Sequence, residues 1–210
     1  MLTTENILFL LLAYLIGAFP SAVWIGQTFY KTDVREYGSG NAGATNTFRT
    51  LGLKAGIPVL FVDILKGWIA VNLIYFIKDY KFFSDELFFE IKLAFGIAAI
   101  FGHLFPVYTG FRGGKGIATM LGLMIGIHLQ AALLSTLVFI ITFLISKYIS
   151  LSSIVASLIF PIVVIVILDS QNASLIIFSI FVPILSLITH QKNIERLLRR
   201  EEKKARFGRK

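Results

Sequence analysis

The sequence predicts an all-α integral membrane protein with about seven transmembrane helices, its N-terminus outside and its C-terminus in the cytoplasm. Three observations lead to this fold class. The 210 residues are 56% hydrophobic and have a mean hydropathy of +0.80, which is too apolar for an ordinary soluble domain. Several apolar runs approach or exceed the ~20 residues that a spanning helix needs. Short polar, charged or glycine-rich segments separate these runs.

The apolar runs give the positions of the expected helices. The predicted spans cover residues 6–29, 56–77, 91–108, 116–127, 130–147, 153–168 and 173–189. The first run lacks a basic segment before it and a small-residue cleavage site after it, so we expect a retained span rather than a signal peptide. The run 117–147 covers about 31 residues, more than one span usually requires. We divide it at His128 and Gln130; five or six spans remain open if some segments are re-entrant.

The distribution of basic residues predicts the orientation. Seven spans place the loops 30–55, 109–115 and 148–152 on the same side as the C-terminal tail. On the other side, Lys78, Lys81 and Lys92 are the only Lys or Arg residues, so the positive-inside rule makes the first side the cytoplasm. We therefore assign the net charge of +8 to cytoplasmic loops and anionic lipid rather than to nucleic acid. The expected organisation is one membrane domain over 1–198 and a basic cytoplasmic tail over 199–210.

A glycine-rich segment after the third span suits a phosphate. It runs from Gly102 to Thr119 and reads GHLFPVYTGFRGGKGIAT. Arg112 and Lys115 supply cationic donors, while Gly113 and Gly114 allow the backbone to turn tightly and expose its N–H groups. Because Lys115 is followed by Gly116 rather than Ser or Thr, the segment is not a Walker A loop and implies no Mg²⁺ ligand. The alternative is a cytoplasmic loop whose cations only set the topology.

Another glycine-rich segment, the first in chain order, follows the first span, so we call it the first glycine-rich segment and Gly102–Thr119 the second. Gly38 to Arg49 reads GSGNAGATNTFR and matches G-x-G-x-x-G. A dinucleotide fold needs a strand before this motif, whereas a membrane span precedes it here, so we reject that interpretation. The segment still concentrates hydrogen-bond donors that can hold a phosphate or a carbonyl oxygen, or it is a plain connector. Its candidate ligands are Ser39, Gly40, Asn41, Gly43, Thr45, Asn46 and Arg49.

Other polar residues lie within or beside the spans. Asp63 and Lys66 can pair on one helix face, either as a structural ion pair or with a direct role in the site. His103 lies at the start of the second glycine-rich segment. Ser150 and Ser153 are either substrate ligands or helix-start residues. After the last span, His190 and Asn193 lie one helical turn apart, and Glu195 follows. The absence of Cys and of a clustered His and carboxylate set predicts no bound metal and no cofactor.

Five motifs in order carry a family resemblance. They are GSGNAGATNTFR, DILKG, GHLFPVYTGFRGGKGIAT, YISLSS and HQKNIERLL, and they span nearly the whole chain. This set resembles the bacterial membrane acyl-phosphate:glycerol-3-phosphate acyltransferases, the PlsY family. The resemblance implies a seven-span enzyme of the bacterial plasma membrane with its active site at the cytoplasmic face. It also implies transfer of a fatty acyl group from acyl-phosphate, rather than from acyl-CoA or acyl carrier protein, to the 1-hydroxyl of glycerol 3-phosphate. The products are lysophosphatidic acid and phosphate, and a soluble acyl-phosphate synthase is the implied partner.

The resemblance also gives the candidate residues their expected roles. Ser39, Lys115 and His190 are the expected catalytic residues, with either His190 or a substrate phosphate as the proton acceptor. The remaining first-segment ligands, together with Arg112, Gly113, Gly114, Ser150, Ser153 and Asn193, are expected to bind substrate. Asp63, Lys66, His103 and Glu195 are expected to support them. The alternative function is a membrane transporter for an anion or phosphate ester, but the spans show no internal repeat and the polar motifs cluster on one face.

Overall fold

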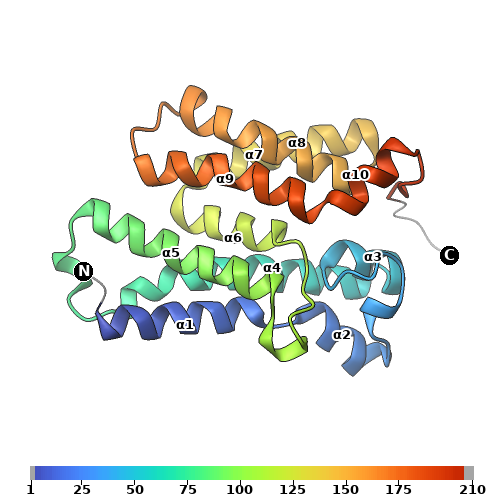
Figure 1. Ribbon diagram of the computed structural model, residues 1–210, viewed down its shortest axis with the longest axis horizontal. Helices are drawn as coiled ribbons and strands as arrows, with labels where there is room; N and C mark the ends of the chain where they lie inside the picture. Colours follow the sequence, from blue (N-terminus) through green and yellow to red (C-terminus); the bar gives the residue numbers. More distant parts are fainter. Residues whose placement is uncertain (1–2, 206–210) are drawn as a thin grey trace. The chain divides into compact units, whose positions relative to one another are not determined.

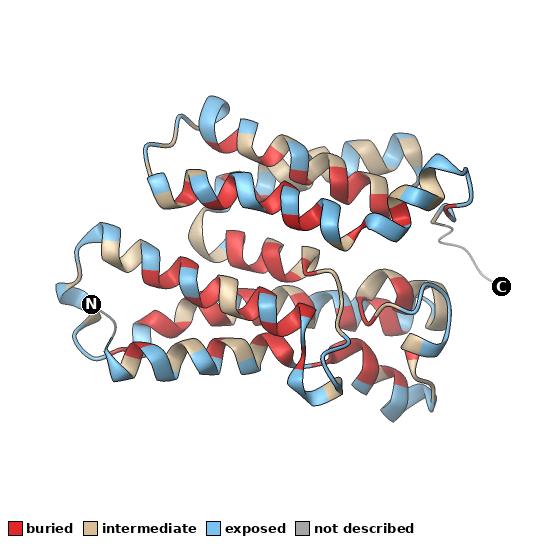
Figure 2. Cartoon of the chain, in the orientation of Figure 1, coloured by how far each residue is buried: buried red, intermediate tan, exposed pale blue. Residues whose placement is uncertain are grey.

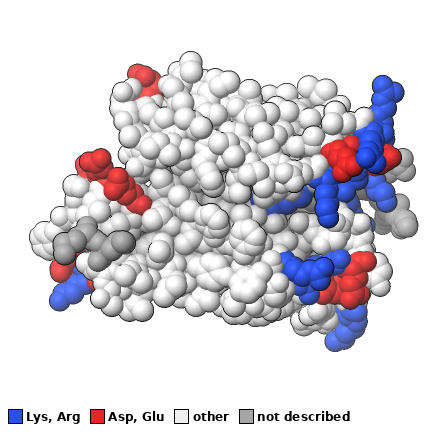
Figure 3. Space-filling view, in the orientation of Figure 1, with Lys and Arg blue, Asp and Glu red and all other residues white. Residues whose placement is uncertain are grey.

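The computed structural model describes residues 3–205, and all the regular elements in that range are helices (Figure 1). The chain divides into two compact units, Met1–Ile127 and His128–Lys210. In Figure 3, most of the visible Lys and Arg side chains of the first unit lie at its α2–α3 end and a smaller group lies at its opposite end, while those of the second unit gather at its α10 end. The predicted orientation rests on such an asymmetry.

The first unit is a layered bundle of six α-helices. They are α1 (Thr4–Ala18), α2 (Ser21–Tyr30), α3 (Ala44–Leu51), α4 (Leu53–Asn72), α5 (Asp85–Leu104) and α6 (Ile117–Ile127). Short 3-10 turns η1 (Val34–Glu36), η2 (Leu73–Phe76), η3 (Tyr80–Phe82) and η4 (Val107–Thr109) lie in its connections. Helix α1 packs along α5, and α4 packs along α6 and also against α5 (Figure 1). Phe95, Ile74 and Ala13 are buried where α1, α4 and α5 meet.

Glycines bring the helices of both packed pairs almost into backbone contact. A Cβ at Gly17 or Gly102 would overlap the backbone of the partner in the α1–α5 pair. Between α4 and α6, a Cβ at Gly67 would overlap the Thr119 carbonyl, and one at Gly122 would overlap the Ile64 carbonyl. Lipid tails are as apolar as Leu, so helices in a membrane associate chiefly through such close packing of small residues.

Gly122→Ala therefore tests the α4–α6 contact. We expect the added methyl group to lower the free energy of unfolding by about 1–3 kcal/mol, because the atom that it meets is backbone and must move with its helix. The measurement is the midpoint of thermal unfolding in detergent. Ile125→Ala, on the same helix but 36% exposed, is the control and should change the midpoint little. An unaltered midpoint for Gly122→Ala would show that the two helices can separate without loss.

The second unit is built around α8. Its helices are α7 (Leu129–Ser146), α8 (Ile149–Ile162), α9 (Ala173–Thr189) and α10 (Gln191–Leu198). Helix α8 packs against both α7 and α9, and a π-helical segment, η5 (Val163–Ile167), continues it after Pro161. Little of α7 is buried although it is strongly apolar: 11% of its residues are buried, and the rest are exposed or partly exposed (Figure 2). Such a surface is stable in lipid, where an exposed apolar side chain costs nothing.

The prediction of an all-helical, multi-span membrane protein is confirmed in its coarse form. Within residues 3–205, four helices are long and apolar enough to cross a membrane, and two bent pairs of helices raise the number to six. The bent pairs are α1 with α2, at 42°, and α9 with α10, at 65°. Helix α6, predicted as the short fourth span, is apolar but has only 11 residues. A count of seven spans and the orientation of the termini stay predictions.

Three predicted boundaries differ from the structure. The expected single span 6–29 is broken before Pro20, because proline lacks an N–H and restricts the residue before it. The second half of the first glycine-rich segment is not a loop but the helix α3, which begins after Gly43. The expected polar turn at 148–153 is the first turn of α8, so Ser150 and Ser153 are helical. Neither serine is the N-cap, because Tyr148 occupies that position.

Candidate functional site

The first glycine-rich segment is held in shape by Asn46. Its side-chain oxygen accepts the Ser39 N–H at 2.8 Å, and its amide nitrogen donates to the carbonyls of Val34 at 2.7 Å and Tyr37 at 3.0 Å. The Asn46 side chain is buried, and Gly38, with φ +65°, lies so close that a Cβ there would overlap its oxygen. Asn46 is one of the predicted substrate ligands, and in the structure its amide bonds to the backbone of Val34, Tyr37 and Ser39. It positions Ser39, which is exposed.

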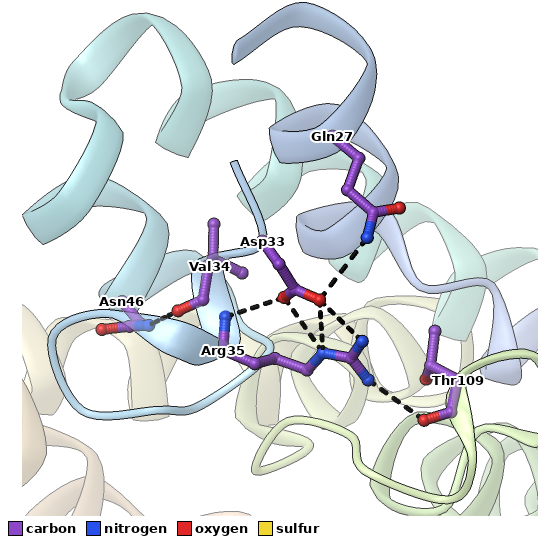
Figure 4. Close-up of polar contacts among 6 residues, drawn as sticks. All are labelled: Gln27, Asp33, Val34, Arg35, Asn46 and Thr109. Atoms are coloured by element: carbon purple, nitrogen blue, oxygen red, sulfur yellow. Dashed lines mark hydrogen bonds and ion pairs between the residues drawn. The ribbon is translucent and has the colours of Figure 1, made fainter. Parts of the chain in front are cut away.

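An ion pair at η1, just before the first segment, is bonded to the second segment (Figure 4). The Arg35 guanidinium meets the Asp33 carboxylate with its Nε and its terminal nitrogen, the closest contact being 2.7 Å. Another nitrogen of Arg35 donates to the Thr109 carbonyl at 3.1 Å. Neither Asp33 nor Arg35 is among the residues predicted from the sequence. An Asp two positions before an Arg is common in polar loops, and nothing local predicts a partner 74 residues away.

The second glycine-rich segment turns tightly over the end of α5. Gly110, Phe111 and Gly116 have φ values of +65°, +60° and +81°. The Gly114 N–H donates to the His103 carbonyl at 3.1 Å. A Cβ at Gly113 would overlap that same carbonyl, and one at Gly114 would overlap the His103 ring. The unusual backbone path therefore depends on Gly110 and Gly116, whereas Gly113 and Gly114, which were predicted to permit the turn, are needed for close approach to His103.

Both cations of the second segment lie just before α6. Arg112 is exposed and Lys115 is half-buried, and the first hydrogen bond of α6 runs from the Met120 N–H to the Gly116 carbonyl. The N–H groups of a first helical turn have no acceptor within the helix and carry partial positive charge. A lysine beside such a turn is a suitable place for an anionic group.

A buried polar cluster lies behind the second segment. The Asp63 carboxylate accepts the Ser21 hydroxyl at 2.7 Å and pairs with Lys66 at 2.9 Å, while the His103 ring nitrogen lies 3.6 Å from it. Lys66 also donates to the Phe19 carbonyl, at the break between α1 and α2. All four side chains of the cluster are buried. The predicted pairing of Asp63 with Lys66 is confirmed, and the cluster connects α2, α4 and α5.

A small hollow with room for about one water molecule adjoins this cluster. It is lined by Gly17, Ala18, Phe19, Pro20, Ser21, Ala42, Lys66, His103, Pro106 and Gly113. Ala42 belongs to the first glycine-rich segment and Gly113 to the second, so both segments reach the same small space as Lys66. Polar groups converging on a concave space are typical of a binding site.

In the second unit, Glu202 gathers the predicted ligands. Its Oε1 accepts the Ser150 hydroxyl at 3.1 Å and the Asn193 amide at 3.0 Å, and its Oε2 pairs with Arg196 at 2.7 Å. The Glu202 side chain is 1% exposed. Ser153 instead donates to the Ile149 carbonyl, one turn back on α8. The sequence assigns residues 199–210 to a basic tail to which no function is given. Within that tail, only the presence of Glu201 and Glu202 among basic residues could have indicated a structural role.

His190 lies at the bend between α9 and α10. Its Nδ1 is 2.9 Å from the Ser186 carbonyl, and a carbonyl only accepts, so Nδ1 donates. The neutral ring therefore carries its proton on Nδ1, which leaves Nε2 as the accepting nitrogen. Glu195, expected to be a structural or supporting residue, pairs with Arg199 at 2.7 Å on the exposed face of α10.

The Asp33–Arg35 pair gives a testable pH dependence. Hydrogen bonds from the Arg35 side chain lower the pKa of Asp33, and the Arg35 N–H and the charges of Arg35 and Arg112 act in the same direction, against a smaller opposing effect of burial. A group whose pKa is lowered by folding stabilises the protein above its unfolded pKa of ~3.9, and that stabilisation disappears as the pH falls through its folded pKa. We expect wild type to unfold at a higher temperature than Asp33→Asn at pH 6. The difference should shrink below about pH 4; a constant difference would contradict this account.

Comparisons with known proteins identify the family of this chain. The family described as glycerol-3-phosphate acyltransferase matches residues 7–200. The chain is 43% identical over 201 residues to the glycerol-3-phosphate acyltransferases of Staphylococcus aureus strains Newman and USA300 / TCH1516, covering 96% of this chain and 98% of each relative. Two crystal structures of PlsY (YgiH), an integral membrane glycerol 3-phosphate acyltransferase, are 32% identical to this chain in sequence. Each match covers 96% of this chain and 96% of the PlsY chain. Their TM-scores are 0.83 for the glycerol 3-phosphate form and 0.80 for the lysophosphatidic acid form.

Proposed function

The chain belongs to the glycerol-3-phosphate acyltransferase family, and from that membership we propose that it takes a fatty acyl group from acyl-phosphate and transfers it to the 1-hydroxyl of glycerol 3-phosphate. The chain is an integral membrane enzyme that acylates glycerol 3-phosphate. The nature of the donor, the residues that act and the side of the membrane are our proposals. We place the reaction at the cytoplasmic face of a bacterial plasma membrane.

One observation carries the donor assignment. In the first unit, two glycine-rich segments with the character of anion sites are both bonded to the turn η1: Asn46 of the first segment donates to the Val34 carbonyl, and Arg35 donates to the Thr109 carbonyl of the second. Acylation by acyl-phosphate brings two phosphate groups to one reaction, one on each substrate. Because an acyl-phosphate already has a good leaving group, positioning and stabilisation of charge supply the rate, and no acyl-enzyme intermediate is needed. The chain has no Cys to form a thioester.

The proposed reaction is a direct displacement at the acyl carbon. The 1-hydroxyl oxygen of glycerol 3-phosphate attacks the carbonyl carbon, the bond from that carbon to the phosphate oxygen breaks, and phosphate leaves. The exposed segment at Ser39, with the backbone of Gly40, Asn41 and Gly43, would stabilise the charge that develops on the carbonyl oxygen. Thr45 and Arg49 on α3, with Arg112 and Lys115, would hold phosphate groups.

The second unit would supply ligands for glycerol 3-phosphate. Ser150, Ser153 and Asn193 are the proposed ligands, and they lie on the first turns of α8 and α10. The proton of the attacking hydroxyl would pass to His190 or to a substrate phosphate. The contact between His190 Nδ1 and the Ser186 carbonyl supports the first route, because it fixes the orientation of the imidazole ring.

Donor choice is the experiment that tests this function. Purified protein would receive glycerol 3-phosphate with either acyl-phosphate or acyl-CoA, and lysophosphatidic acid and free phosphate would both be quantified. We expect equal amounts of the two products from acyl-phosphate and none from acyl-CoA. Product from acyl-CoA alone would overturn the donor. Activity that rises when a soluble acyl-phosphate synthase is supplied with its own substrates would support the proposed partner.

A further inference from the structure

We propose that Arg35 is a positioning residue, which fixes the first glycine-rich segment against the second so that acyl transfer can occur. This inference rests on the proposed function, since it assumes that both segments act on the substrates. It assigns a role to residues outside the motifs that predicted the function. Every contact that carries it lies within the first unit (Figure 4).

Arg35 is itself held rigidly. The Asp33 carboxylate caps η1 by accepting the Arg35 N–H at 2.9 Å, and it also receives the Arg35 side chain in a two-pronged contact. Gln27 of α2 approaches the same carboxylate at 3.5 Å. A planar guanidinium paired to a carboxylate in this way loses most of its rotational freedom, which a lysine in its place would keep.

From this position Arg35 reaches the second segment. Its remaining terminal nitrogen donates to the carbonyl of Thr109, the last residue of η4. Thr109 directly precedes Gly110 and Phe111, whose positive φ values set the path toward Arg112 and Lys115. A hydrogen bond at this carbonyl therefore fixes the start of the turn that carries both cations.

The first segment is bonded to Val34, the residue directly before Arg35. The Val34 carbonyl, next to Arg35 in the chain, accepts the Asn46 amide, and Asn46 in turn holds the backbone of Ser39. The two segments also approach each other at their glycines, where a Cβ on Gly43 would lie 4.0 Å from the Gly114 Cα. Arg35 is thus the polar link between a segment that holds Ser39 and a turn that holds Lys115.

The geometry favours positioning over direct binding of substrate. Each of the three guanidinium nitrogens of Arg35 donates to a protein oxygen, two of them to Asp33 and one to Thr109. A substrate phosphate would have to replace one of these oxygens. Arg35 therefore acts on the reaction through the segments that it joins, and a misplacement of about 1 Å between catalytic groups can cost ~10²-fold in rate.

Kinetics of Arg35→Lys, Asp33→Asn and the double variant test the proposal. We expect each single change to lower kcat about 10-fold and to change the KM for glycerol 3-phosphate by less than about 2-fold, because alignment and not binding is lost. The double variant should be no slower than either single variant, because each single change already breaks the same contact between Asp33 and Arg35. Lys54→Gln removes an exposed charge of the same unit and should keep wild-type rates. A raised KM with unaltered kcat, or multiplied losses in the double variant, would overturn the proposal.

A distance measurement tests the link without any turnover, so it stands apart from the proposed function. The chain has no Cys, and spin labels can therefore be attached at Glu36→Cys and Val107→Cys, both of which are exposed. We expect a narrow distribution of label distances in this background and a broadened or shifted one when Arg35→Lys or Asp33→Asn is added. An unaltered distribution would overturn the positioning role even if the rate fell. Failure of wild type to use acyl-phosphate would instead concern the donor alone.

Discussion

Lys115→Ala is expected to lower kcat/KM by about 10²–10³-fold while the protein stays folded. Lys115 lies directly before Gly116 and the first turn of α6, where the helix already favours an anion. Its ammonium is proposed to stabilise phosphate charge as the bond to the acyl group breaks, and removal of one such group from a preorganised site has effects of this size. The measurement is the steady-state rate of lysophosphatidic acid formation with both substrates varied.

Folding and general charge effects are separable from this loss. Lys54→Ala removes a lysine from the exposed start of α4 and should leave the rate unaltered. The thermal unfolding midpoint of Lys115→Ala should stay near that of wild type, because Lys115 is half-buried at the edge of the bundle rather than in its core. Wild-type turnover by the folded Lys115→Ala protein would remove Lys115 from the proposed catalytic group.

Glu202→Gln is expected to have the second largest effect, a fall in kcat/KM of about 10²-fold together with a lower unfolding midpoint. The Glu202 carboxylate is buried and receives three donors, from Ser150, Asn193 and Arg196. An amide in its place cannot pair with Arg196, and its NH₂ group cannot accept, so donors that are now satisfied would lose a partner. Two of those donors are proposed ligands of glycerol 3-phosphate, so we expect the KM for that substrate to rise.

The neighbouring residue offers a matched control. Glu201 has the same charge and lies one position earlier, but it is exposed. Glu201→Gln should therefore keep the rate, the KM and the unfolding midpoint of wild type. Equal behaviour of the two variants would show that the contacts of Glu202 do not matter. For the same reason we expect removal of residues 199–210 to be harmful, and we propose that the membrane domain extends through Glu202 rather than ending at 198.

Local sequence determined the class of this protein and much of its site. The apolar runs predicted helices in nearly the right places, because twenty apolar residues have few stable alternatives to a helix in lipid. Glycines beside Arg112 and Lys115 predicted a tight, cationic turn, since backbone freedom and charge are properties of the residues themselves. The break before Pro20 could have been predicted from the same local rules, which disfavour helix before a proline.

Only the tertiary structure decided which polar groups are engaged and with what. Asn46 is predicted as a substrate ligand, and only the structure shows that its amide forms hydrogen bonds with the backbone of Val34, Tyr37 and Ser39. Arg35 and Glu202 looked like ordinary loop and tail charges, yet their partners Thr109 and Ser150 lie 74 and 52 residues away. Periodicity and motif spacing report neighbours within a few residues along the chain. A hydrogen bond between distant segments depends on how helices pack, and here that packing depends on glycines such as Gly67 and Gly122, whose contacts are with backbone that only the folded chain brings near.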